Sequence, residues 1–68
     1  MPAVKIIEIT GTSEESWQDA AEEAYREASK TIDDISGIEE KDWTAQVEDG
    51  EISEYRATTH ISFPVRSD

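Results

Sequence analysis

The chain has 68 residues and carries 17 acidic against 6 basic side chains, so its formal charge is −11. This length predicts one domain, residues 1–68, and the charge argues against nucleic-acid binding because it repels a phosphate backbone. The sequence has no cysteine, which excludes disulfides and thiolate metal sites. It also has no apolar run long enough to span a membrane. We therefore expect a soluble, cytoplasmic protein with no membrane partner. The acidity is typical either of a halophilic source or of an ordinary solvated acidic surface.

Residues 3–10 are rich in β-branched side chains and end at Gly11, which predicts a strand. Ile6 would lie on one side of this strand and Ile7 on the other, so both of its faces are apolar. A chain of this length has too few residues to cover both faces. The first strand therefore indicates a contact with another subunit.

A helix is predicted over about residues 13–34. Thr12 and Glu15 fit a capping box, and Ser13 is a competing N-cap. Small and apolar residues then recur every three or four positions: Trp17, Ala20, Ala21, Ala24, Ala28, Ile32 and Ile35. Because most of this stripe is alanine, the helix should lie close against a sheet.

Two further strands are predicted over about residues 38–48 and 51–65, because apolar and polar side chains alternate there. Asp49-Gly50 between them is a strong hairpin signal. The order of elements is strand, helix, strand, strand. If the first strand pairs with the last, the sheet is antiparallel in order 1-3-2 and the protein is a two-layer α+β unit.

The small apolar content also indicates self-association. Domains of this size usually need a disulfide, a metal or partner subunits. With no Cys and a single His, the chain has neither disulfides nor a multi-histidine metal site. Association of identical copies is the support that remains.

Few residues favour catalysis. The lone His60 lies in the middle of a predicted strand on a polar face, and the three glycines are isolated rather than gathered in a phosphate-binding loop. We therefore expect the protein not to be an enzyme.

Calcium could bind where carboxylates of neighbouring subunits converge, with Glu39, Glu40 and Asp42 as candidate ligands. Solvated acidic faces are the alternative interpretation of the same residues.

The sequence resembles the dodecin family. The resemblance lies in the run GTSEES at 11–16, in EY at 54–55 and ISF at 61–63, and in the order and length of the elements over about residues 3–65. It implies a β-α-β-β unit whose three-stranded antiparallel sheet wraps around the helix, assembled as a hollow homododecamer. It also implies a flavin bound in pairs at subunit contacts and a role in storing or sequestering that ligand.

Two positions depart from the flavin-binding pattern. Gly37 stands where flavin-binding dodecins carry a Trp that stacks on the ring, and Arg56 stands where they carry a Gln. Asp42 matches the Asp that approaches the ligand's side chain in some members. The resemblance thus places riboflavin, FMN or FAD near Gly37, Asp42 and Arg56. The alternative is a non-flavin dodecin that binds calcium or another cation, or that is a purely structural shell.

Overall fold

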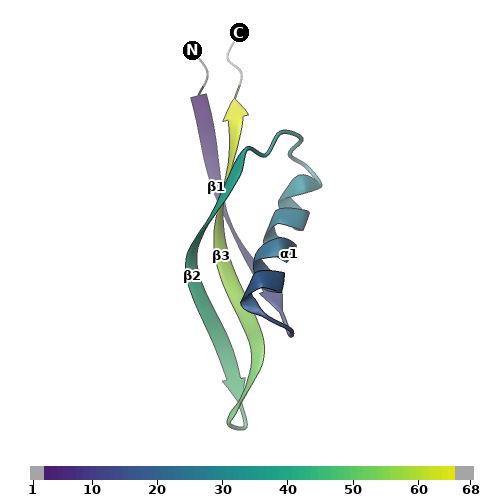
Figure 1. Ribbon diagram of the computed structural model, residues 1–68, viewed down its shortest axis with the longest axis vertical. Coiled ribbons are helices and arrows are strands. Elements are labelled where there is room, and N and C mark those ends of the chain that lie inside the picture. Colours follow the sequence, from purple (N-terminus) through teal and green to yellow (C-terminus); the bar gives the residue numbers. More distant parts are fainter. Residues whose placement is uncertain (1–2, 66–68) are drawn as a thin grey trace.

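The computed structural model describes residues 3–65, which form three strands and one helix (Figure 1). The elements are β1 (Ala3–Ser13), α1 (Trp17–Ser29), β2 (Gly37–Glu48) and β3 (Glu51–Val65). Both strand pairs are antiparallel, and the sheet order is β1-β3-β2. The α+β class, the β-α-β-β order and the strand order expected from the sequence are confirmed.

A tight turn joins β2 to β3. Asp49 and Gly50 have φ angles of 54° and 78°, the left-handed pair that a type I′ hairpin turn requires. The turn sets Glu48 opposite Glu51. Further along, one extra residue in β3, Ser53, shifts the pairing, and one extra residue in β2, Lys41, shifts it back.

The helix begins later than the sequence suggested. Its N-cap is Ser16, whose side chain accepts a hydrogen bond from the amide of Asp19 at 3.0 Å. The predicted caps Thr12 and Ser13 belong to β1 instead. The Ser13 hydroxyl accepts from the amide of Glu15 at 2.9 Å and donates to Asp19 Oδ2 at 2.7 Å. The capping-box interpretation was therefore wrong, because these polar groups hold the turn that precedes the helix.

The helix also ends earlier, at Ser29 rather than near residue 34. Its last amides bond three residues back, from Lys30 to the carbonyl of Glu27 at 3.3 Å, which tightens the final turn. β-Branched Thr31 and Ile32 follow, and the acidic pair 33–34 would lie at the negative end of the helix dipole. Ile32 thus continues the apolar period of the helix, but the β-branched residues and the acidic pair disfavour another helical turn.

Gly11 lies inside β1 and does not end it, contrary to the sequence-based expectation. A Cβ atom at this position would clash with the carbonyl oxygen of Ala20 and would lie 2.8 Å from the amide nitrogen of Ala24. The strand therefore passes directly under the helix backbone. Glycine is needed here for close approach and not for a turn.

The core lies between α1 and one face of β1 and β3 (Figure 1). Thr59 and Ile61 are its largest fully buried side chains, and the other buried apolar residues are alanines: Ala20, Ala21, Ala24, Ala28 and Ala57. The alanine stripe thus lets the helix lie close to the sheet, as predicted. No helix in the described residues has the length and apolar character needed to cross a membrane.

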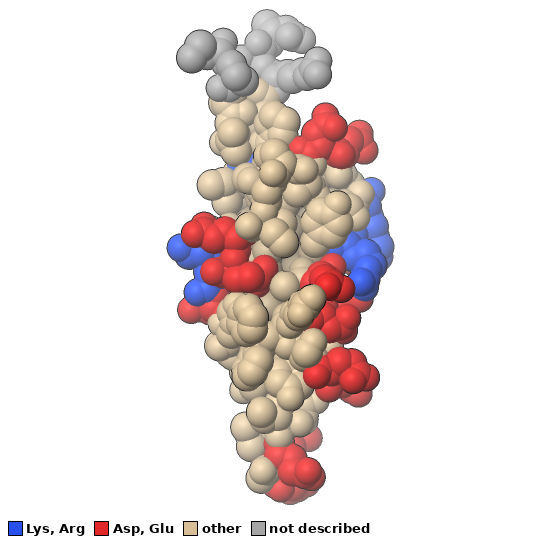
Figure 2. Space-filling model, viewed as in Figure 1, with Lys and Arg blue, Asp and Glu red and all other residues tan. Residues whose placement is uncertain are grey.

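Much of the apolar surface stays outside this core. Within residues 3–65, eight large apolar side chains are exposed: Val4, Ile6, Tyr25, Ile38, Trp43, Val47, Ile52 and Val65. The radius of gyration is 14.1 Å, against roughly 11 Å for a compact domain of this length. One copy is therefore elongated and incompletely packed. Figure 2 shows that acidic side chains outnumber basic ones on the flanks of the face it presents.

Candidate functional site

The sheet face opposite α1 carries the candidate ligand-binding residues. We call it the open face and define it by the row Ile6, Ser62 and Gly37, which lie side by side on β1, β3 and β2. Alternation puts the even-numbered residues of β3 from 54 to 62 on this face, because Ala57, Thr59 and Ile61 are buried against the helix. The register of the three strands determines which residues lie side by side in each row of the open face.

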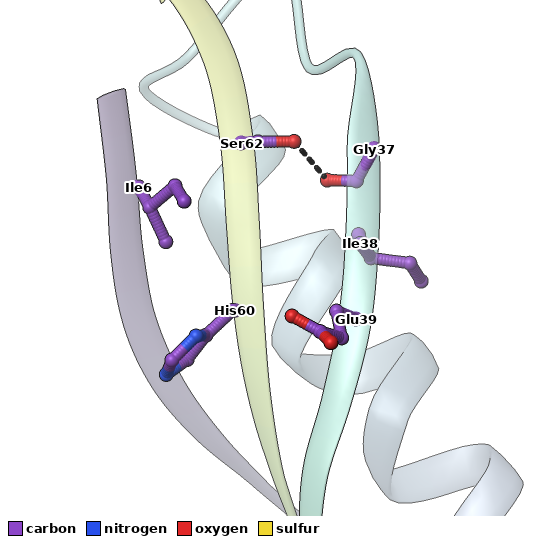
Figure 3. Close-up of a pocket in the computed structure, with 6 residues that line it drawn as sticks. All are labelled: Ile6, Gly37, Ile38, Glu39, His60 and Ser62. Atoms are coloured by element: carbon purple, nitrogen blue, oxygen red, sulfur yellow. Dashed lines mark hydrogen bonds between the residues drawn. The ribbon is translucent and has the colours of Figure 1, made fainter. Parts of the chain in front are cut away.

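A shallow pocket of about 140 Å³ lies at one end of the open face (Figure 3). Its lining residues are Ile6, Gly37, Ile38, Glu39, His60 and Ser62. The Ser62 hydroxyl donates to the carbonyl oxygen of Gly37 at 3.2 Å, and a Cβ atom at position 37 would lie 3.1 Å from that hydroxyl oxygen. The missing side chain of Gly37 is therefore part of what leaves the pocket open.

The size of this pocket limits what one copy can hold. Sites for small organic ligands typically enclose about 300–1,000 Å³ and bury most of the ligand. The pocket here has less than half of the smallest volume in that range, and it opens onto a flat sheet. A planar ligand lying on it would be covered on one side only. A second surface is needed to complete such a site.

His60 lies in the centre of the next row. Its Nε2 atom is 2.8 Å from Glu8 Oε1, and its side chain is 29% exposed. Glu39 lies opposite His60 on the other side, in register on β2. The imidazole therefore contacts a carboxylate and lies between two acidic residues. Sequence reasoning missed Glu8, because nothing in the sequence fixes the register of β1 on β3.

Asp42 and Arg56 also lie on the open face, beyond the pocket. Asp42 is opposite Thr58, and the Arg56 guanidinium Nε donates to Glu54 Oε2 at 2.9 Å on its own strand. The row of Gly37 and the row of Arg56 are six residues apart along β3, roughly 20 Å at the usual rise of a strand. Gly37, Asp42 and Arg56 thus share a face, but one copy does not gather them around a single small ligand.

The bulge at Lys41 explains why Gly37 and Asp42 share this face. Simple alternation would put positions 37 and 42 on opposite sides of β2. The extra residue reverses the alternation, so that both pair with even-numbered residues of β3. For the same reason Glu40 and Asp42, which have the same parity, face opposite sides.

The predicted metal ligands are divided by this geometry. Glu39 and Asp42 lie on the open face, whereas Glu40 lies on the helix side and accepts from the Thr59 hydroxyl at 2.9 Å with both carboxylate oxygens. Within residues 3–65, no three His, Cys, Asp or Glu side chains are grouped closely enough to hold a metal ion. A calcium site on these acids would need carboxylates from other copies, as expected from the sequence.

An aromatic cluster lies on the helix side of the sheet. Trp17 is 5.7 Å from Trp43 and 4.9 Å from Tyr55 between ring centroids. The Trp17 indole donates to the carbonyl of Thr44 at 2.8 Å, which fixes its orientation. Trp43 is 54% exposed but lies on the opposite side of the sheet from the pocket. It therefore does not replace the stacking Trp that the pocket lacks.

Comparisons with known proteins agree over nearly the whole chain. The family model for dodecin matches residues 3–66. The calcium dodecin of Mycobacterium tuberculosis is 35% identical over 66 residues, covering 97% of this chain and 93% of that protein. A crystal structure of this calcium dodecin, described as having a novel calcium-binding site, superposes with a TM-score of 0.83 at 36% identity, covering 97% of this chain and 94% of that chain. A mutant of the Thermus thermophilus dodecin gives a TM-score of 0.92 at 25% identity, with both chains fully covered.

Proposed function

This chain belongs to the dodecin family, and from that premise we propose that its copies form a hollow homododecamer that stores or sequesters a flavin at contacts between subunits. The flavin would be riboflavin, FMN or FAD. The shell would lie in the cytoplasm and would hold its ligand without catalysing a reaction. Members of the family form homo-oligomers that bind small ligands, and the finer assignment to a flavin is our proposal.

The observation that carries this proposal is the incomplete pocket on the open face. Its volume is about 140 Å³, and on the open face Ile6 in its lining and Val4 on the same strand are 59% and 62% exposed. Contact with a second copy would bury these apolar groups and enclose a planar ligand between two such surfaces. Burial of apolar area contributes roughly 25 cal/mol per Å², which favours this contact.

Three residues would contact the ligand, and they would come from more than one copy because the rows of Gly37 and Arg56 lie roughly 20 Å apart on one copy. Gly37 would leave room for the ring, Asp42 would approach the polar side chain of the flavin, and Arg56 would lie flat against a ring or pair with a phosphate. Arg56 would have to exchange its bond to Glu54 for a bond to the ligand. Because an arginine cannot accept a hydrogen bond, it does not reproduce the contact of the usual Gln.

The direct test combines the absorption spectrum of freshly purified protein with titration of riboflavin, FMN and FAD by fluorescence quenching. The proposal predicts a yellow protein, or quenching that saturates at a fixed ratio of flavin to subunit. Colourless protein that quenches none of the three flavins would remove the flavin assignment. The mass of the same sample tests the shell independently of the ligand.

Restoring the aromatic platform sharpens the test. Stacking on an aromatic side chain contributes about 1–3 kcal/mol per ring, so Gly37→Trp should tighten flavin binding by about 5–150-fold. The new Cβ atom would press on the Ser62 hydroxyl oxygen, 3.1 Å away. Gly37→Trp combined with Ser62→Ala removes that contact, and Ser62→Ala alone is the matched control. Unchanged affinity in the double variant would show that this surface does not hold the ring.

A calcium-binding shell is the second candidate, favoured by the 35% identity to the calcium dodecin. Calcium takes six to eight oxygen ligands, and within residues 3–65 one copy groups no three acidic or His side chains closely enough to hold the ion. Glu39 and Asp42 would contribute from several copies around a symmetry axis, whereas Glu40 is bound to Thr59 on the other side. Calorimetry should then show calcium binding that Glu39→Gln and Asp42→Asn weaken and Glu40→Gln spares. No heat above background with calcium would remove this candidate.

A further inference from the structure

The tip of the β2–β3 hairpin carries the only Asp-Gly pair of the chain. Asp49 and Gly50 form the turn, and both are exposed. A Cβ atom added at Gly50 would meet nothing within 4 Å, so the backbone amide of Gly50 is open to solvent. In a two-residue hairpin turn the closing hydrogen bonds join the flanking residues, here Glu48 and Glu51, and leave this amide out. An unshielded amide nitrogen therefore adjoins a side-chain carboxyl group.

The tip is held more weakly than the rest of the sheet. It extends beyond α1, so no helix covers it (Figure 1). The extra residue Ser53 interrupts the pairing, and only two rows lie beyond it. One row sets Glu48 opposite Glu51, and like charges directly opposite each other destabilise a strand pair. The other pairs Val47 with Ile52, which are 63% and 49% exposed. Because so little is buried, the tip opens more readily than the sheet under α1.

We propose that Asp49 is a site of spontaneous covalent modification, at which the side chain closes onto the amide of Gly50 and reopens as isoaspartate. The carboxylate first takes up a proton. The Gly50 nitrogen then bonds to the Asp49 Cγ carbon, and the carboxyl hydroxyl leaves as water with the amide proton, which gives a cyclic imide. Water adds back to either carbonyl of this ring. Breaking the new bond restores aspartate, whereas breaking the original peptide bond gives isoaspartate, and no oxidant or reductant is needed.

The other aspartates within residues 3–65 lack this arrangement. All are followed by a residue whose side chain crowds the amide nitrogen: Asp19, Asp33, Asp34 and Asp42. After Asp19, the amide of Ala20 already donates to the carbonyl of Ser16 at 3.0 Å. Asp42 lies in the paired part of β2, opposite Thr58. These four positions are internal controls in the same molecule.

Isoaspartate at position 49 would also change the hairpin. It adds one carbon to the backbone of a turn that has only two residues, both with positive φ. The register of Glu48 opposite Glu51 depends on this turn. The modified tip therefore loses its pairing beyond Ser53, whereas the part of β3 that packs under α1 keeps its pairing.

The experiment incubates the purified full chain at physiological temperature and neutral pH, and quantifies isoaspartate at each position by peptide mapping against an unincubated sample. Aspartyl and isoaspartyl peptides have the same mass and are separated by chromatography. Gly50→Asn is the matched variant, because asparagine tolerates the left-handed conformation of Gly50 but shields the amide nitrogen with a side chain. Asp49→Asn is the positive control, because it forms the same ring with loss of ammonia in place of water.

Isoaspartate should accumulate at position 49 of the natural chain and stay at its starting level at the four control positions. Gly50→Asn should slow this accumulation several-fold. Amide hydrogen exchange of the separated isoaspartyl form should show loss of protection over residues 47–52 and none over residues 54–61.

A natural chain without isoaspartate at position 49, after Asp49→Asn has converted under the same conditions, would overturn the modification. Equal accumulation at the control positions would show that the turn does not select the site. Unchanged protection over residues 47–52 would overturn the loss of pairing at the tip. Each of these results is independent of any ligand and of the number of subunits.

Discussion

The two faces of the same sheet differ in how completely the chain covers them. On the helix side, alanines of α1 pack on Ala57, Thr59 and Ile61, which are fully buried. On the open face, Val4 and Ile6 are about 60% exposed and the charged row around His60 meets solvent. The part of the helix side that lies under α1 is thus covered within one copy. The open face is not covered within one copy, and on the helix side Ile38 and Trp43 of β2 also stay 50% and 54% exposed.

The comparison predicts that the same substitution has different effects on the two faces. Gly11→Ala places a methyl group against the helix backbone at Ala20, so β1 and α1 must separate. We expect it to lower the free energy of unfolding by about 3 kcal/mol or more. The methyl group of Gly37→Ala on the open face meets only the Ser62 hydroxyl, which can rotate. This substitution should change the free energy of unfolding by less than about 1 kcal/mol.

Urea unfolding of both glycine variants at one protein concentration measures this difference, since the stability of an assembly depends on concentration. Equal losses in the two variants would contradict the close approach of β1 to α1.

Two neighbouring threonines allow the second comparison. Thr59 is fully buried and donates to Glu40, whereas the Thr58 hydroxyl meets Thr10 at 3.2 Å on the exposed side. Thr59→Val keeps the shape but leaves the carboxylate of Glu40 without this donor, so it should cost about 1–2 kcal/mol. Thr58→Val should cost less than about 0.5 kcal/mol. Thermal unfolding checks the order, and a larger loss for Thr58→Val would mean that the faces are assigned the wrong way round.

The smallest expected effect concerns the approach to the helix. Ser13→Ala removes an acceptor for the Glu15 amide and a donor to Asp19, and should cost about 1 kcal/mol. Thr12→Ala, at an exposed position of the open face, should be nearly neutral. Chemical denaturation of the two variants distinguishes the observed contacts from the capping box predicted from sequence. A larger loss for Thr12→Ala would favour the capping box.

The sequence predicted the elements where a single local signal dominated. Asp49-Gly50 predicted the hairpin, and the alternation in β3 correctly put His60 on the face opposite the buried side chains. The ends of the helix were mistaken because serine and threonine caps compete over residues 12–16, and because the apolar period continues through Ile32 after the helix has ended. Gly11 was misinterpreted because close approach of two backbones leaves no local pattern.

The site was less predictable than the fold because it depends on register. The turn sets the pairing of β2 and β3, but the two compensating bulges at Ser53 and Lys41 have no clear sequence signal. They decide that Gly37 and Asp42 share a face and that Glu40 does not. The contact between Glu8 and His60 depends on the pairing of β1 with β3, which are separated by most of the chain.

The most direct test of the account is the mass of the purified protein in solution, measured by light scattering as the sample is diluted at moderate salt. One copy has a mass of 7.6 kDa. We expect a particle about twelve times heavier that loses its fold when it dissociates, because in the proposed shell other copies would cover the open face. A folded, thermally stable particle of 7.6 kDa would contradict it.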